Sequence, residues 1–231
     1  MKKKSNIICI ITARSGSKGL KNKNIRKLKG LPLVAHTIIA AKKSKILSKV
    51  ILSTDSKLYG KIGTKFGAEV PFIRPKKLAT ATAHHPDVVN HAVNFVEKKE
   101  EIIFDYVVML QPTSPFRKSK HIDEAIKKFL REKNDSLISV KKQNYPPWWL
   151  FFLKKKKLGQ FLKYKNKNVF NLERQEFPNL YRPNGAIYVS KRNTLFKGNL
   201  INPKSCSYYI MDEKDSVDID NLIDLKVAEN I

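Results

Sequence analysis

Short apolar runs alternate with longer amphipathic stretches over most of the chain. Short, mostly apolar runs predict strands at residues 6–13, 49–54, 69–74, 106–111 and 136–141. Stretches with the helical spacing of apolar positions lie between them, at residues 32–43, 56–66, 86–98 and 120–131. Strands that alternate with helices are typical of an α/β domain with a mostly parallel sheet flanked by helices.

The alternation stops between residues 143 and 180, where no strand–helix period is readable. This segment contains the apolar run Trp148-Trp149-Leu150-Phe151-Phe152, and an apolar patch of this kind usually marks an interface. We therefore interpret residues 143–180 as an inserted arm that docks on a second copy of the chain, which predicts a homodimer. The alternative is that the arm folds back over its own sheet.

The α/β pattern resumes after the arm. Strands are predicted at 185–189, 208–211 and 216–219, followed by a final helix. We therefore take residues 1–231 as one domain that includes the arm. The two cysteines, Cys9 in an apolar run and Cys206 in a polar one, indicate free thiols in a reducing compartment rather than a disulfide framework.

No segment is apolar for long enough to span a membrane. The longest uninterrupted apolar run, 148–153, is six residues, whereas a spanning helix needs about 20. Lys2 to Lys4 followed by an apolar stretch resembles the start of a signal peptide, but Thr12 and Arg14 end that stretch without a cleavage site. We expect a cytoplasmic protein with no membrane partner.

The chain is strongly basic, with 46 Lys and Arg against 20 Asp and Glu and a net charge of +26. This balance raises the hypothesis of a basic nucleic-acid-binding protein. However, only 8 of the basic residues are Arg, and 38 Lys together with 22 Ile and 17 Asn are typical of AT-rich coding drift. The few arginines also fall in motif segments, which favours an enzyme over a specific nucleic-acid binder.

The loop after the first predicted strand, residues 13–24, combines glycines with positive charge. Gly16 and Gly19 allow backbone N–H groups to approach an anion, and Arg14, Lys18 and Lys23 supply positive charge. Its spacing matches neither the P-loop nor the dinucleotide fingerprint. The loop therefore predicts a phosphate cradle, with a solvated basic turn as the alternative.

Two further segments end strands at the same predicted sheet edge. Asp55 follows the second strand, where capping of the next helix is favoured over a nucleotide contact. Gln111 opens the segment Gln111-Pro112-Thr113-Ser114-Pro115-Phe116-Arg117 and has an amide suited to sugar hydroxyls. A rigid turn with capping hydroxyls is the alternative for that segment.

Scarce arginines and aspartates mark the last candidate sites. Arg174 and Arg182 have the planar fork that binds a carboxylate, which indicates an acidic substrate. Asp218 and Asp220 would project to one face of the strand predicted at 216–219, and two carboxylates beside phosphates suit Mg²⁺. Charge balance on a basic surface is the alternative. His84, His85 and His91 lack the spacing of metal ligands, so we assign no metal to them.

Taken in order, these segments resemble the CMP-N-acylneuraminate synthetases, the cytidylyltransferases that activate sialic and related nine-carbon acids. The resemblance runs from Ala13-Arg14 through 110–117 and Arg182-Pro183-Asn184-Gly185 to the aspartates at 218 and 220. It implies a Rossmann-like nucleotide-diphosphosugar-transferase fold with an inserted dimerisation arm. The implied reaction joins CTP and an acidic nine-carbon sugar into a CMP-sugar with release of pyrophosphate. It depends on Mg²⁺, with Mn²⁺ as an alternative, and would serve lipopolysaccharide or capsule biosynthesis.

The resemblance also implies roles for individual residues. Arg14, Lys18 and Lys23 match the phosphate-contacting loop, and Asn24 matches the asparagine that reaches the nucleotide. Arg74 matches an arginine on the cytidine side, and Gln111 matches the sugar-binding glutamine. Arg174 and Arg182 match arginines that hold the acidic sugar, and Asp218 and Asp220 match the metal-binding pair. Arg14, Lys23 and Arg174 are the expected catalytic residues.

One stretch departs from the family pattern. After Leu78-Ala79 many members have an acid and then hydroxyl residues, whereas this chain has Thr80-Ala81-Thr82-Ala83-His84-His85. We therefore leave residues 80–85 out of the predicted site. A legionaminic or pseudaminic acid is the alternative to N-acylneuraminate as the substrate.

Overall fold

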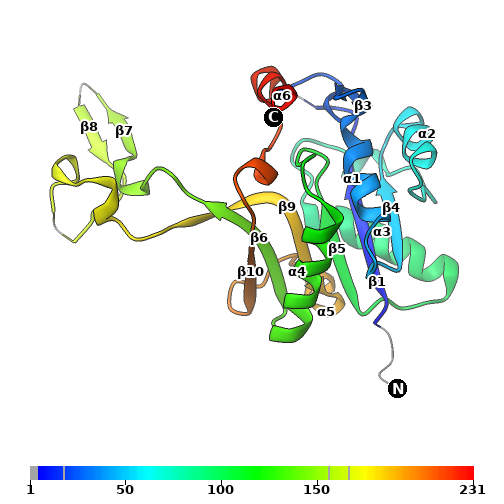
Figure 1. The fold of residues 1–231 in the computed structure, drawn as a ribbon. Helices are drawn as coiled ribbons and strands as arrows, with labels where there is room; N and C mark the ends of the chain where they lie inside the picture. Colours follow the sequence, from blue (N-terminus) through cyan, green and yellow to red (C-terminus); the bar gives the residue numbers. More distant parts are fainter. Residues whose placement is uncertain (1–4, 18, 156, 166) are drawn as a thin grey trace.

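The computed structural model describes residues 5–17, 19–155, 157–165 and 167–231, and within them a six-stranded sheet lies between helices (Figure 1). The strands of this sheet are β1 (Ile7–Thr12), β4 (Lys49–Ser53), β5 (Tyr106–Leu110), β6 (Ser136–Lys142), β9 (Tyr181–Lys191) and β10 (Cys206–Ile210). The helices are α1 (Leu33–Lys42), α2 (Lys57–Lys65), α3 (His85–Glu100), α4 (Ser119–Glu132), α5 (Arg192–Phe196) and α6 (Leu222–Glu229). Two short pairs, β2 (Lys27–Leu28) with β3 (Leu31–Pro32) and β7 (Phe151–Lys154) with β8 (Lys157–Gln160), complete the strands.

The sheet is mainly parallel, as the alternating pattern predicted. Its order is β10-β6-β9-β5-β1-β4, with β4, β1 and β5 parallel to one another and β10 parallel to β6. The exception is β9, which runs antiparallel to both β5 and β6. The carboxyl ends of β1, β4 and β5 therefore meet at one edge, which is where ligands bind in α/β sheets.

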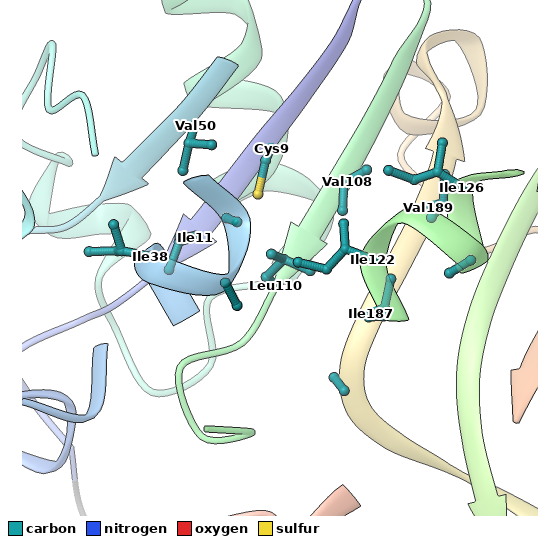
Figure 2. Packing of buried hydrophobic residues seen from close by; sticks show 14 of the residues in the cluster. Cys9, Ile11, Ile38, Val50, Val108, Leu110, Ile122, Ile126, Ile187 and Val189 are labelled. Atoms are coloured by element: carbon teal, nitrogen blue, oxygen red, sulfur yellow. The ribbon is translucent and has the colours of Figure 1, made fainter. Parts of the chain in front are cut away.

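Alternate side chains of β1 pack into two separate hydrophobic cores, one on each face of the sheet. Cys9 and Ile11 face the layer of α1 and α4, together with Leu110, Ile122 and Ile126 (Figure 2). Ile8 and Ile10 face the other side of the sheet, where the core includes side chains of α3 and α5. Burial of the Cys9 thiol raises its pKa to about 12, and Cys206 is also a free thiol.

Two of the predicted strands were wrong. Residues 69–74 pair at a single bridge, between Glu69 and Ile51, because Pro71 has no N–H with which to continue the ladder. Residues 216–219 are not a strand either, since the chain forms a 3₁₀ turn over Lys214–Ser216. The buried Asn184 side chain donates to the Ser216 Oγ at 2.9 Å, so a side chain rather than a strand partner fixes this segment.

Residues 143–180 leave the sheet after β6, project away from it as an arm, and return into β9 (Figure 1). The arm carries the antiparallel β7–β8 pair and has a core of its own, in which Trp148 stacks on Phe177 with ring centroids 5.3 Å apart. The arm does not lie over its own sheet. It leaves large apolar side chains in solvent, including Leu153 at 85% and Phe170 at 69% exposure.

None of the helices in the described ranges is long and apolar enough to cross a membrane. The described ranges also contain no disulfide, in line with the expectation of free thiols.

Leu110 is fully buried as the last residue of β5, directly before the segment that opens at Gln111. We expect Leu110→Ala to lower the free energy of unfolding by about 2–5 kcal/mol, because it removes buried surface and leaves a cavity. Urea denaturation followed by circular dichroism measures the change. Leu58→Ala is the control, since Leu58 is 56% exposed on α2. Equal stability of the two variants would contradict this packing.

Candidate active site

A cleft of about 440 Å³ opens at the sheet edge where β1, β4 and β5 end. Three parts of the chain supply most of its lining: the loop after β1, the turn after β5, and residues 74–88. The residues lining the cleft are Thr12, Arg14, Ser17, Gly19, Lys23, Asn24, Arg74, Leu78, Thr80, Ala81, Ala83, His85, Val88, Gln111, Pro112, Thr113 and Asp220.

The loop after β1 is fixed by an acid from the neighbouring strand. The Asp55 carboxylate accepts from the Ser15 backbone N–H at 2.8 Å and from the Ser15 hydroxyl at 2.7 Å. The expected capping role of Asp55 was wrong, because the Ser56 hydroxyl caps α2 by accepting from the Tyr59 N–H at 3.3 Å. Asp55 therefore holds the predicted phosphate loop to the end of β4.

The other side of this loop closes on the segment that carries Asp220. The Lys23 ammonium pairs with the Asp220 carboxylate at 2.8 Å. A Cβ at Gly19 would lie 2.8 Å from the Asp220 carbonyl oxygen, so only glycine allows this approach. The Asn24 amide donates to the Arg14 carbonyl at 2.9 Å. The predicted contribution of Lys18 lies outside the described residues.

Arg14 lines the cleft but its guanidinium folds over its own loop, where Nη1 donates to the Gly16 carbonyl at 2.7 Å. That single backbone contact leaves the remaining donors of the fork for an anion. The loop thus offers the Arg14 guanidinium before its glycines and the Lys23 ammonium after them.

Asp218 and Asp220 lie near each other although they are not on a strand. Loss of water around the carboxylate raises the pKa of Asp218 above its ordinary value, a hydrogen bond from Thr113 opposes this, and the charge of Asp220 raises it further. Two adjacent carboxylates that repel each other form an arrangement that a divalent cation would stabilise. No cluster of three or more potential metal ligands occurs in the described part of the chain, so further ligands would come from substrate or water.

Contacts to both its backbone carbonyl and its side chain position Gln111. Its carbonyl accepts from Nη1 of the fully buried Arg117 at 3.2 Å, and the same nitrogen donates to the Ala186 carbonyl at 2.9 Å. Its side chain lies against Gly185, where a Cβ would be 2.6 Å from the Gln111 Oε1. Gly185 has a φ of +75°, so its backbone conformation favours glycine as well.

Arg74 is buried beneath the cleft, and its guanidinium N–H groups donate to other groups of the protein. Nε donates to the Ser53 hydroxyl at 3.0 Å, Nη1 to the Leu78 carbonyl at 3.4 Å, and Nη2 to the Ser53 carbonyl. Burial lowers the pKa of Arg74 to about 10, with Asp55 opposing the shift. The predicted residue lies in the cleft, and the structure shows that it also joins β4 to the turn at residues 76–78.

The departing stretch at residues 80–85, which we left out of the predicted site, does line the cleft. His85 is in hydrogen-bonding distance of the Gln111 amide, with 3.4 Å between the two Nε2 atoms. Burial, together with the positive charges of Arg74 and Arg14, lowers the pKa of His85. An uncharged imidazole therefore faces Gln111 at neutral pH.

Arg174 and Arg182 are not part of this lining in a single chain. Arg174 lies on the arm, where its guanidinium donates to the Asn144 amide oxygen at 2.8 Å beside a separate hollow of about 380 Å³. Arg182 lies on β9 directly opposite Lys141 of β6. One chain therefore brings together Arg14, Lys23, Asn24, Arg74, Gln111 and Asp220, with Asp218 adjacent, and leaves Arg174 on the arm.

Sequence reasoning missed the contacts of Asp55 and Arg117. The sequence did contain a signal for these two residues. Arg117 is one of only 8 arginines, Asp55 is one of 20 acids, and both lie in segments that follow predicted strands. Ser15, the partner of Asp55, is 40 residues away in the sequence, and Ala186, a partner of Arg117, is 69 residues away. Sequence spacing does not reveal such contacts.

A protein-family model described as cytidylyltransferase matches residues 8–214 of the chain. Among similar proteins, the post-translational flagellin modification protein B of Campylobacter coli is 37% identical over 97% of this chain and 94% of its own length. The N-acylneuraminate cytidylyltransferase of Escherichia coli O18:K1:H7 is 36% identical over 99% of this chain, which spans 52% of that protein. The CMP-N,N'-diacetyllegionaminic acid synthase of Legionella pneumophila is 32% identical over 97% of this chain and 95% of its own length.

The fold also has a solved counterpart. The structure of a CMP:2-keto-3-deoxy-manno-octonic acid synthetase complexed with CTP superposes with a TM-score of 0.70 at 14% identity, covering 98% of both chains. At this identity the likeness concerns the fold alone.

Asp55 provides a direct test of how the loop after β1 is held. We expect Asp55→Asn to weaken the binding of CTP about tenfold, because the loop loses a charge-assisted hydrogen bond. Calorimetric titration with CTP in the absence of a second substrate measures the affinity. Glu229→Gln, an exposed carboxylate on α6, is the control. Unchanged CTP affinity in Asp55→Asn would show that the loop does not need this anchor.

Proposed function

Because the chain belongs to the cytidylyltransferase family, we propose that it transfers the cytidylyl group of CTP to a nine-carbon 2-keto acid sugar. The products are the CMP-sugar and pyrophosphate. The observation that carries the proposal is the juxtaposition, in one cleft, of a glycine-containing cationic loop, the Gln111 amide and the carboxylate of Asp220. Relatives named for N-acylneuraminate and N,N'-diacetyllegionaminic acid support this substrate class.

The two ends of the cleft suit different parts of CTP. Arg14, Gly19 and Lys23 lie at the end that suits the triphosphate, since cations and free backbone N–H groups bind phosphate oxygens. The part lined by Leu78, Val88 and the small side chains of Ala81 and Ala83 suits the flat nucleobase. The chain therefore orients the nucleotide by charge at one end and by shape at the other.

Asp218 and Asp220 are the residues that would hold Mg²⁺ or Mn²⁺. Their chemistry fits, because both are hard oxygen ligands and the charge of Asp220 raises the pKa of Asp218. Such an ion would supply positive charge that offsets the negative charge of the phosphates. Asp220 also pairs with Lys23 at 2.8 Å.

In the proposed reaction the anomeric hydroxyl of the sugar attacks the α-phosphorus of CTP. The bond from the α-phosphorus to the bridging oxygen breaks, pyrophosphate leaves with that oxygen, and the proton of the attacking hydroxyl passes to solvent. Arg14 and Lys23 stabilise the negative charge that develops on the phosphate oxygens. Gln111, held by Arg117 and Gly185, positions the sugar through its amide.

We propose that two chains form a homodimer through their arms. The arm exposes Leu153, Leu158, Phe161 and Phe170, which need a covering surface. Arg174 lies on this arm and does not line the cleft of its own chain. A second chain would bring Arg174 to the cleft of its partner, where its fork binds the acidic sugar.

The cytoplasm, where CTP is available, is the proposed compartment. The product would serve lipopolysaccharide or capsule assembly, or the modification of flagellin for which the Campylobacter coli relative is named. A legionaminic or pseudaminic acid is the second candidate substrate, because the relatives are named for different acids. We do not propose specific nucleic-acid binding, because most of the basic residues behind the charge of +26 are lysines spread along the chain.

Pyrophosphate release with CTP and Mg²⁺ tests the proposed function. A panel of sialic, legionaminic and pseudaminic acids should include at least one acid that turns over, and absence of turnover with all of them would contradict the proposal. Asp218→Ala should lower kcat/KM by at least about 100-fold, or about 2.7 kcal/mol. Asp212→Ala, an exposed aspartate on the same segment, is the matched control.

The composite site is tested by mixing two inactive chains. Arg174→Ala and Asp218→Ala should each be at least about 100-fold less active as pure homodimers. In a mixed dimer, the Arg174→Ala chain has intact aspartates and receives Arg174 from the Asp218→Ala chain. Mixing equal amounts after dissociation should therefore restore about a quarter of wild-type activity, if pairing is statistical. No recovery, or a monomer by light scattering at micromolar concentration, would contradict the arm exchange.

A further inference from the structure

Two cations face each other where the sheet passes into the arm. Lys141 of β6 and Arg182 of β9 are directly opposite in the antiparallel register, so their side chains share one face. Like charges in this position destabilise a sheet. Within the described parts of the chain, neither forms an ion pair within 4.0 Å. An anion between or beside the two charges would offset this repulsion.

The position of Lys141 is set by the layer beneath it. Ser139, at the irregularity of the register between Ile138 and Val140, donates to the Asn184 amide oxygen at 2.6 Å. The Asn184 amide nitrogen donates in turn to the Ser216 hydroxyl at 2.9 Å. The Lys141 Nζ lies 3.5 Å from the Ser216 carbonyl oxygen. The ammonium is therefore fixed beside the segment that leads into Asp218.

The charges around Lys141 show which region it faces. Partial burial lowers the pKa of the Lys141 ammonium and the charge of Arg182 lowers it further, while Glu213 and Asp218 oppose the shift. Lys23 and Asp220 also act on Asp218. Lys23 of the phosphate loop pairs with Asp220, and Lys141 contacts the Ser216 carbonyl, so Asp218 lies along the chain between the two contacted residues.

Resting on the proposed function, we propose that Lys141 joins Arg182 in binding the carboxylate of the acid sugar. An attacking hydroxyl must approach the α-phosphorus from the side opposite the departing pyrophosphate. The phosphate loop contacts Asp220 whereas Lys141 contacts Ser216, so we place the acceptor beside Lys141 and Arg182, apart from the phosphate loop. A guanidinium fork and an ammonium together satisfy both carboxylate oxygens.

This contact would orient the nucleophile as well as bind the sugar. In a 2-keto acid the carboxylate is attached to the carbon that carries the anomeric hydroxyl. The attacking oxygen is two bonds from the carboxylate carbon, so holding the carboxylate at Lys141 and Arg182 also fixes the position of that oxygen. A sugar without the negative charge would lose this orientation, so Lys141 is a specificity residue for acids.

The test compares an acid with its methyl ester. The full-length enzyme is assayed by pyrophosphate release with CTP and whichever acid of the panel turns over, and then with the methyl ester of that acid. The variants are Lys141→Met, which keeps the aliphatic stem, Lys141→Arg, which keeps the charge, and Lys127→Met as the control on the exposed face of α4. Thermal unfolding of each variant shows whether it folds.

We expect Lys141→Met to lower kcat/KM for the acid at least about tenfold, with the KM for CTP and kcat/KM for the ester nearly unchanged. Lys141→Arg should retain most of the activity with the acid. If Lys141→Met leaves kcat/KM for the acid unchanged, or lowers kcat/KM equally for acid and ester, the inference is overturned while the proposed function stays intact. Absence of turnover in the wild-type enzyme would instead contradict the proposed function, and this inference with it.

Discussion

The insertion of β9 between β5 and β6, antiparallel to both, is the constraint on which the rest of the structure depends. Because β9 returns beside the strand from which the chain left, the two ends of the arm emerge side by side. The same strand carries Asn184, whose buried amide ties Ser139 to Ser216 and so holds the segment of Asp218 without a strand partner. Gly185, the next residue, leaves room for the Gln111 side chain. One strand thus connects the arm, the aspartates and the Gln111 amide.

Electrostatics in this protein depend on where the few acids lie. The chain has a net charge of +26, yet the cleft is organised by a small number of carboxylates. Asp55 shapes the loop after β1, and Asp220 holds Lys23 across the cleft. The fully buried Arg117 has no carboxylate within ion-pair distance in the described chain, and burial lowers its pKa to about 10. It acts through neutral carbonyls instead, joining the residue after β5 to the middle of β9.

The sequence allowed the fold class and most of the sheet to be predicted, because buried parallel strands are continuous apolar runs with helices between them. The prediction failed at residues 216–219, where alternating apolar and acidic residues resemble a strand but the Asn184 side chain replaces the strand partner. For the cleft, the loop at 13–24 and Gln111 were predictable from residue type and from their place after strands. The roles of Asp55, Arg117 and Lys141 were not, since each depends on a contact across 40 or more residues or on the register of β6 with β9.

The central claim is that a sugar hydroxyl attacks the α-phosphorus of CTP within this cleft. An isotope experiment tests it most directly: the acid sugar is labelled with ¹⁸O at the anomeric hydroxyl and the products are followed by ³¹P NMR and mass spectrometry. The account predicts that the label remains in the bridge between the sugar and the phosphorus of CMP, and that pyrophosphate contains none. Label in pyrophosphate, or a CMP-sugar with an unlabelled bridge, would contradict attack by the sugar hydroxyl.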